Sequence, residues 1–144
     1  MLKDEIGRLL PHGKSMWLLD SVEAWDDRTI SCRTSTHRDQ RNPLRARGCL
    51  TASAGLEYAA QAMGAHVGLL DRDRRDAHQI GYVGSVRDVV FSIDRLDDLA
   101  GDLRVDATRM VEGDNSYMYR FTISHSGLAI IEGRASIFVK AQSS

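Results

Sequence analysis

The sequence predicts an α+β domain in which an antiparallel sheet wraps around one long central helix. Residues 52–70 are apolar or small at almost every position, which is typical of a helix buried on all sides. Segments in which apolar and polar side chains alternate, as they do in strands, both precede and follow this stretch. A single buried helix within a run of strands favours a sheet that curves around it.

Length and composition predict a single domain over residues 1–144. No repeat, low-complexity tract or Pro/Gly/Ser-rich linker divides the chain. Its 19 Lys and Arg nearly balance its 20 Asp and Glu, which gives a formal net charge of −1. Proteins that bind nucleic acid are usually strongly basic, so this balance argues against a nucleic-acid partner.

The cysteines and the N-terminal residues indicate a cytoplasmic protein. Cys32 and Cys49 are too few for a disulfide scaffold and lack the spacing of zinc ligands, so we expect free thiols and no bound metal. Residues 1–10 carry acidic and basic side chains where a signal peptide needs an apolar stretch, and no segment has the character of a membrane span. We expect no membrane partner and no cofactor.

The chain before the long helix predicts a β-hairpin. Residues 16–25 and 29–36 have strand character, and Asp26-Asp27 is a plausible turn between them. The second strand is expected to be half-buried, because its side chains alternate between two faces. One face carries Ile30, Cys32 and Thr34, and the other carries Ser31, Arg33 and Ser35. A short amphipathic helical segment, residues 3–10, precedes the hairpin.

The long helix is predicted over residues 52–70, after a polar loop of residues 37–49. Five apolar residues recur at helical spacing, namely Leu56, Ala60, Met63, Val67 and Leu70. We expect the charged run of residues 71–76 to end the helix as a solvated cluster.

Four strands are predicted after the helix. They lie within residues 80–94, 103–109, 117–123 and 131–139. Gly113-Asp114-Asn115 and Ser126-Gly127 predict tight turns between the last three. One helix cannot cover both ends of such a sheet, so we expect a homodimer that joins two sheets edge to edge and places sites at the interface.

Glu57 is the only formally charged side chain in the predicted helix. Burial would raise its pKa and the helix N-terminus would lower it, a balance that suits acid–base chemistry. Gln61, one turn later, could hold the carboxylate or a bound water. Gly55 permits close approach to the backbone, and the unpaired N–H groups of this first turn could form an oxyanion site. Alternatively, Glu57 caps the helix or pairs with Arg45 or Arg47.

Four stretches carry a family resemblance. They are Leu10-Pro11-His12-Gly13 with Leu18-Leu19-Asp20, then Asn42-Pro43-Leu44, then Gly55-Leu56-Glu57-Tyr58-Ala59-Ala60-Gln61-Ala62, and finally Gly81 to Val90 with Ser85-Val86-Arg87-Asp88. All four resemble parts of the β-hydroxyacyl-acyl carrier protein dehydratases. The first resembles that family's opening and first strand, and the second resembles its active-site loop. The third resembles the catalytic part of the central helix, and the fourth resembles the strand that follows it. The sequence is most similar to the branch of 3-hydroxyacyl or hydroxymyristoyl carrier-protein dehydratases that includes those linked to aryl-polyene clusters.

The resemblance implies a hot-dog fold and a dimer whose two active sites each combine a histidine of one subunit with the acid of the other. It implies reversible elimination of water from (3R)-hydroxyacyl thioesters of acyl carrier protein, in fatty-acid or polyene-type biosynthesis. Glu57 would protonate the departing hydroxyl. Asn42 joins Gly55 and Gln61 as a candidate substrate-binding residue. The family's histidine lies in a Gly-His-Phe-Pro loop, which this chain lacks.

Five histidines are candidates for the base: His12, His37, His66, His78 and His125. His66 lies about half a turn out of phase with Glu57 and roughly 13 Å along the helix axis, so we expect a partly buried residue with one hydrogen bond. His37 is the best candidate, because it begins the loop that leads to the active-site region and Asp39 could orient its ring. The alternative for His37 is a surface loop histidine.

Five arginines fall within fifteen residues that contain a single acid, Asp39. They are Arg33, Arg38, Arg41, Arg45 and Arg47. Acyl carrier proteins are acidic and carry their substrate on a phosphorylated arm, so Arg41, Arg45 and Arg47 are candidate docking residues. The alternative is a solvated loop with local salt bridges.

Two other functions stay open. The hot-dog fold also hydrolyses acyl thioesters with a helix carboxylate as base, so a thioesterase is one alternative. The other is a non-catalytic subunit that binds acyl chains or completes a heterodimer, which the missing Gly-His-Phe-Pro loop favours.

Overall fold

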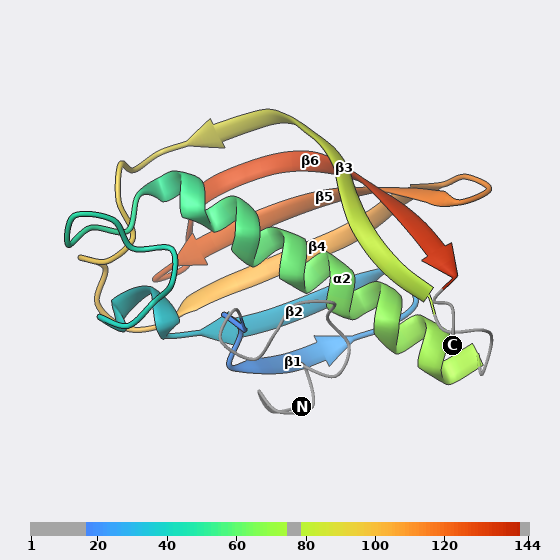
Figure 1. Cartoon of the computed structure of the whole chain (residues 1–144), viewed down its shortest axis with the longest axis horizontal. Helices are drawn as coiled ribbons and strands as arrows, with labels where there is room; N and C mark the ends of the chain where they lie inside the picture. Colours follow the sequence, from blue (N-terminus) through green and yellow to red (C-terminus); the bar gives the residue numbers. More distant parts are fainter. Residues whose placement is uncertain (1–16, 75–78, 142–144) are drawn as a thin grey trace.

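The computed structural model describes residues 17–74 and 79–141. Six strands form one antiparallel sheet in the order β1-β2-β4-β5-β6-β3, and helix α2 lies across one face of it (Figure 1). The strands are β1 (Ser21–Trp25), β2 (Thr29–Thr34), β3 (Gln79–Phe91), β4 (Leu103–Glu112), β5 (Ser116–His125) and β6 (Leu128–Ala141). The helix α2 spans Gly55–Arg74. The predicted class, a sheet around one long helix, is confirmed.

The predicted hairpin is confirmed as β1 and β2. The turn between them is held by Asp26, whose Oδ1 atom accepts hydrogen bonds of 2.8 Å from the N–H groups of Arg28 and Thr29. The buried face of β2 carries Ile30, Cys32 and Thr34, as the two-residue alternation predicts. The first strand begins at Ser21 rather than at residue 16. Residues 3–10 and the 10–13 motif lie outside the described residues.

Helix α2 is buried over most of its length, but it begins and ends later than the predicted residues 52 and 70. Residues 52–54 form a separate 3-10 turn, η3 (Ala52–Ala54), so the α-helix begins at Gly55. At the other end the charged run does not stop the helix, which continues to Arg74. Asp and Arg lower helix stability only slightly and do not interrupt the backbone hydrogen bonds, so charge alone is a weak stop signal.

The four later strands are confirmed; β4, β5 and β6 extend beyond their predicted ranges, whereas β3 ends at Phe91 rather than at residue 94. The β5–β6 turn uses Ser126 and Gly127 with φ of 52° and 80°, the left-handed pair that matches the twist of a two-residue hairpin. A second 3-10 turn, η2 (Thr36–Arg38), begins the long loop that precedes the helix.

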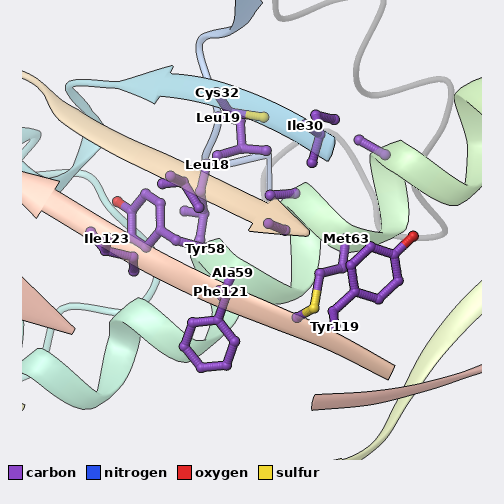
Figure 2. Packing of buried hydrophobic residues seen from close by; sticks show 14 of the residues in the cluster. Leu18, Leu19, Ile30, Cys32, Tyr58, Ala59, Met63, Tyr119, Phe121 and Ile123 are labelled. Atoms are coloured by element: carbon purple, nitrogen blue, oxygen red, sulfur yellow. The ribbon is translucent and has the colours of Figure 1, made fainter. Parts of the chain in front are cut away.

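The core lies between α2 and the sheet (Figure 2). Two fully buried tyrosines, Tyr58 from the helix and Tyr119 from β5, lie at opposite ends of the labelled cluster. A buried tyrosine needs a partner for its hydroxyl group. Each of these hydroxyls belongs to a polar network, and the network at Tyr58 adjoins Glu57.

Candidate active site

Glu57 lies half-buried in the first turn of α2. The Gln61 amide nitrogen is 3.4 Å from Glu57 Oε1, so the predicted contact between these side chains is confirmed. Gln61 is only 1% exposed, and its Oε1 accepts a hydrogen bond of 2.9 Å from the Leu18 N–H. Because the second bond fixes the amide, Gln61 presents its N–H to the carboxylate in one orientation.

The Tyr58 hydroxyl connects the first turn of α2 to η2. The Thr36 hydroxyl donates to the Leu18 carbonyl at 2.6 Å, so it accepts from the Tyr58 hydroxyl at 2.7 Å. Burial raises the pKa of Tyr58, which keeps this hydroxyl protonated. The two polar groups of Leu18, its N–H and its carbonyl, are thus held by Gln61 and Thr36. One network therefore links the Glu57 turn, Leu18 in the segment before β1, and η2.

Asn42 holds the loop after η2. Its amide nitrogen donates to the Thr36 carbonyl and to the Tyr58 hydroxyl oxygen, each at 2.9 Å, and its Oδ1 accepts from the Leu44 N–H at 2.9 Å. The residue is 6% exposed. Both amide hydrogens are used within the protein, so Asn42 holds the loop, and its contact with substrate stays a prediction.

Gly55 has a packing role that the sequence interpretation missed. Its N–H donates to the carbonyls of Ala52 and Ser53, because the 3-10 turn before the helix supplies acceptors. The Gly55 N–H is therefore paired, and an oxyanion site at the other N–H groups of the first turn stays a prediction. A Cβ atom at Gly55 would lie 2.5 Å from Ile131 Cδ1 and 3.1 Å from Ile123 Cδ1, so the glycine lets the helix approach the sheet.

His37 is fully buried in η2, so the surface-loop alternative is wrong. Its Nε2 atom donates to the Leu99 carbonyl at 3.0 Å, and Leu99 rather than Asp39 orients the ring. Nδ1 is buried with no hydrogen-bond partner in the described part of the chain. Burial lowers the pKa of His37, which favours a neutral ring with its lone pair on Nδ1. No hydrogen bond joins this ring to Glu57.

His66 is fully buried and makes two hydrogen bonds, not the one expected of a partly buried residue. Nε2 donates to the Asp26 carbonyl at 2.8 Å, and Nδ1 accepts from the Tyr119 hydroxyl at 2.6 Å. Arg109 donates to the same hydroxyl oxygen at 3.0 Å and stacks 3.6 Å from the Tyr117 ring centre. The turn between β1 and β2 supplies the second partner, which helical spacing could not predict.

The predicted docking arginines have different surroundings. Arg45 donates to the carbonyls of Asp39, Gly48 and Arg38 at 2.9–3.4 Å and so holds the loop. Arg41 is 92% exposed, with Nε 3.5 Å from Asp39 Oδ1. Arg47 and Gly48, both with positive φ, form the exposed tip of a tight turn. The loop lies at the end of the molecule where α2 begins (Figure 1), which is also the end that carries Glu57.

A family model described as ApeP-like, ApeP dehydratase, matches residues 4–144. The chain belongs to the ApeP-like dehydratase family. This confirms the resemblance to hot-dog dehydratases on which the sequence interpretation rested. A search of curated protein sequences finds no significant match.

Solved structures show that this ApeP-like dehydratase has the hot-dog fold. A chain of the dehydratase heterocomplex ApeI:P from Xenorhabdus doucetiae superposes with a TM-score of 0.85 at 23% identity, over 95% of this chain and 91% of that one. A hypothetical thioesterase with coenzyme A from Streptococcus pneumoniae superposes at 0.62, with 17% identity over 86% and 88% of the two chains. A mutant thioesterase from Pseudomonas aeruginosa gives 0.63, with 18% identity over 95% and 86%.

The sequence interpretation did not predict the roles of Tyr58 and Thr36, whose hydroxyl groups are hydrogen-bonded to each other. The signal was a tyrosine beside Glu57 on a helix predicted to be buried, since such a hydroxyl requires a polar partner. Asp97 was missed as well: it accepts from the Leu50 N–H at 3.0 Å and pairs with Arg95. These contacts brace the segment that leads into the helix.

The thiols of this ApeP-like protein are free, as predicted, and burial raises the pKa of Cys32 to about 12. Within residues 17–74 and 79–141, no three His, Cys, Asp or Glu side chains are grouped to hold a metal ion. No helix in these two ranges is long and apolar enough to cross a membrane.

Proposed function

We propose that this protein dehydrates (3R)-hydroxyacyl thioesters of acyl carrier protein to trans-2-enoyl thioesters, with Glu57 as the acid. The observation that carries the proposal is the half-buried Glu57 carboxylate held by Gln61 at the start of a buried helix. Membership of a dehydratase family supports the reaction class.

In the proposed reaction a base removes the proton from the carbon next to the thioester carbonyl. The electron pair of that C–H bond forms the new double bond, and the bond from the neighbouring carbon to its hydroxyl oxygen breaks. Glu57 donates the proton with which the hydroxyl leaves as water. His37 is the candidate base within this chain, because its buried, neutral ring keeps an unprotonated Nδ1 atom.

The experiment compares Glu57→Gln with the native protein in the hydration of a crotonyl thioester, which runs the reaction backwards. We expect the variant to fold and to lose activity by about 10²- to 10⁴-fold. Glu23→Gln is the matched control, because Glu23 is an exposed carboxylate on β1. Full activity of Glu57→Gln would remove Glu57 from the mechanism, and release of free thiol from acyl thioesters would favour a thioesterase instead.

A second candidate is a subunit that needs a different hot-dog partner to complete its active site. It is favoured by the buried position of His37, whose ring makes no hydrogen bond to Glu57. The ApeI:P structure is itself a dehydratase heterocomplex. In this case the chain supplies Glu57 and the partner supplies the histidine. Inactivity of the pure chain, with activity restored by a second hot-dog subunit, would support this candidate over the first.

Strand β3 is the proposed edge for joining a second subunit, identical or different. Among the described strands it pairs only with β6, so its outer edge offers unpaired backbone groups. Four of its apolar side chains are 38–59% exposed: Val83, Val86, Val90 and Phe91. A second sheet added here would pair those backbone groups and cover these side chains.

We place the carrier-protein contact at the loop where α2 begins. Arg41 and the turn at Arg47 are exposed there, and both are free of the loop-holding role that Arg45 has. A phosphorylated arm that enters beside them would approach the Glu57 end of the helix. The expected consequence is that Arg41→Gln with Arg47→Gln raises KM for a carrier-bound substrate and leaves kcat unchanged.

A further inference from the structure

Three arginines lie directly opposite one another on neighbouring strands. Arg120 of β5 pairs with Arg134 of β6, and Arg134 pairs with Arg87 of β3. All three are exposed. Their neighbours Tyr119 and Ala135 are buried, so Arg120 and Arg134 point away from α2, and direct pairing places Arg87 on the same outer face. We call Arg87, Arg134 and Arg120 the arginine row.

The arginine row is not neutralised within the described part of the chain. None of its members forms an ion pair there, whereas Arg104 on the same face has its Nε 3.0 Å from Asp106 Oδ2. Like charges directly opposite one another destabilise a sheet. Arg134 therefore has a like charge directly opposite it on each side, Arg87 of β3 and Arg120 of β5.

Apolar side chains adjoin the row on one side. Met118, two residues before Arg120 and on its face, pairs with Val111 of β4. Val111 is 61% exposed and Phe138, farther along β6, is 52% exposed. On the other side of the row, Glu132 follows the same face of β6. The outer face thus presents cations beside an apolar strip of Met118, Val111 and Phe138.

We propose that this outer face binds an acidic, amphipathic helix of a partner protein, laid across β3, β6 and β5 (Figure 1). Two strand spacings are about 9.6 Å. Helix residues i and i+7 are about 10.5 Å apart along the axis, so carboxylates at i, i+4 and i+7 would each meet one arginine. Apolar residues on the adjoining face of the helix would pack on the apolar strip.

Nucleic acid matches this surface less well. A phosphate backbone gains nothing from the exposed apolar side chains of Val111 and Phe138, whereas an amphipathic helix can cover them. The chain has a net charge of −1, whereas nucleic-acid binders are usually strongly basic. This surface is distinct from the loop proposed for the carrier arm, so the inference stands apart from the proposed function.

The test measures binding of a fluorescent helical peptide, with Glu at i, i+4 and i+7 and Leu on the adjoining face, to the full chain by anisotropy. We expect Arg134→Gln to weaken binding by about tenfold, in line with the loss of one charge-assisted hydrogen-bonded pair. Arg104→Gln is the matched control and should have no effect, because Arg104 is already paired. A peptide with Gln in place of Glu should not bind.

Three outcomes would overturn the proposal. They are absence of binding by the Glu peptide, an equal loss with Arg104→Gln, and tighter binding of single-stranded DNA with the same dependence on Arg134. Thermal unfolding gives a second readout. Because Arg134→Gln relieves repulsion from two neighbours, we expect Tm to rise by about 1–3 °C. A fall in Tm would contradict the repulsion on which the inference rests.

Discussion

The Nδ1 atom of His66 lies 2.6 Å from the Tyr119 hydroxyl oxygen, and this contact defines the protonation of both side chains. Since Nε2 of His66 donates to the Asp26 carbonyl, Nδ1 carries the lone pair and Tyr119 donates. Burial lowers the pKa of His66 and raises that of Tyr119 to about 12. The fold therefore holds a neutral histidine and a protonated tyrosine.

Acid should destabilise the protein through His66. Its pKa in the folded state is lowered, so as pH falls below about 6.5 the unfolded state takes up the proton first. The stability is fully present above that pH and is lost as pH falls toward the folded-state pKa. Urea unfolding between pH 7.5 and 5 should show this loss, and His66→Gln should reduce it. An unchanged pH profile in the variant would contradict the assignment.

Gly55→Ala should destabilise the protein mainly through the closest contact of the new methyl group. The new Cβ would meet Ile131 Cδ1, at a cost of about 1–2 kcal/mol in the free energy of unfolding. Ile131→Val removes that methyl group, so Gly55→Ala should be neutral or stabilising in its presence. A double-mutant cycle followed by urea unfolding measures this coupling. Because Ala retains the N–H, activity per folded molecule should not change; additive effects would exclude the contact.

Tyr58→Phe should loosen the loop beside Glu57. It removes the acceptor of Asn42 and the donor to Thr36, leaving buried polar groups unpaired at a cost of about 1–3 kcal/mol. Tyr117→Phe is a suitable control, because that ring is only half-buried and contacts Arg109 through its face. Denaturant unfolding checks stability. Equal stability of both variants would mean that the Tyr58 hydroxyl does not hold the loop.

Substitution of His37 should distinguish the two candidate functions, a dehydratase that uses its own histidine and a subunit that needs a partner's histidine. If it is the base, His37→Gln abolishes hydration of a crotonyl thioester while circular dichroism shows a folded chain. If a different subunit supplies the histidine, the variant retains activity once that subunit is added. A spectroscopic check of folding is required in both cases, because His37 also holds the Leu99 carbonyl.

A charge on the free edge of β3 should prevent subunit pairing. Val90 is 59% exposed, and Val90→Lys would place an ammonium group in the proposed interface. Light scattering after gel filtration should show a shift toward monomer. Leu128→Lys controls for surface charge, since Leu128 is 71% exposed beside the β5–β6 turn. A shift of equal size in the control would contradict the edge assignment.

Local sequence patterns were enough to predict the order of helix and strands, the turns at residues 26–27 and 126–127, and the Glu57–Gln61 contact. Each depends on a short-range property: a two-residue or helical period, a preference for positive φ, or the four-residue spacing of one helix face. These properties act between residues that are close in sequence, so they can be recognised without knowing the whole fold.

Only the tertiary structure decided the surroundings of the site. Burial of His37 depends on Leu99, the packing of Gly55 on Ile131, and the second bond of His66 on Asp26, all of them distant in sequence. The arginine row depends on strand register, which a shift of one residue would destroy. Spacing along a chain does not specify which distant atoms meet, because those contacts are selected by the packing of the whole domain.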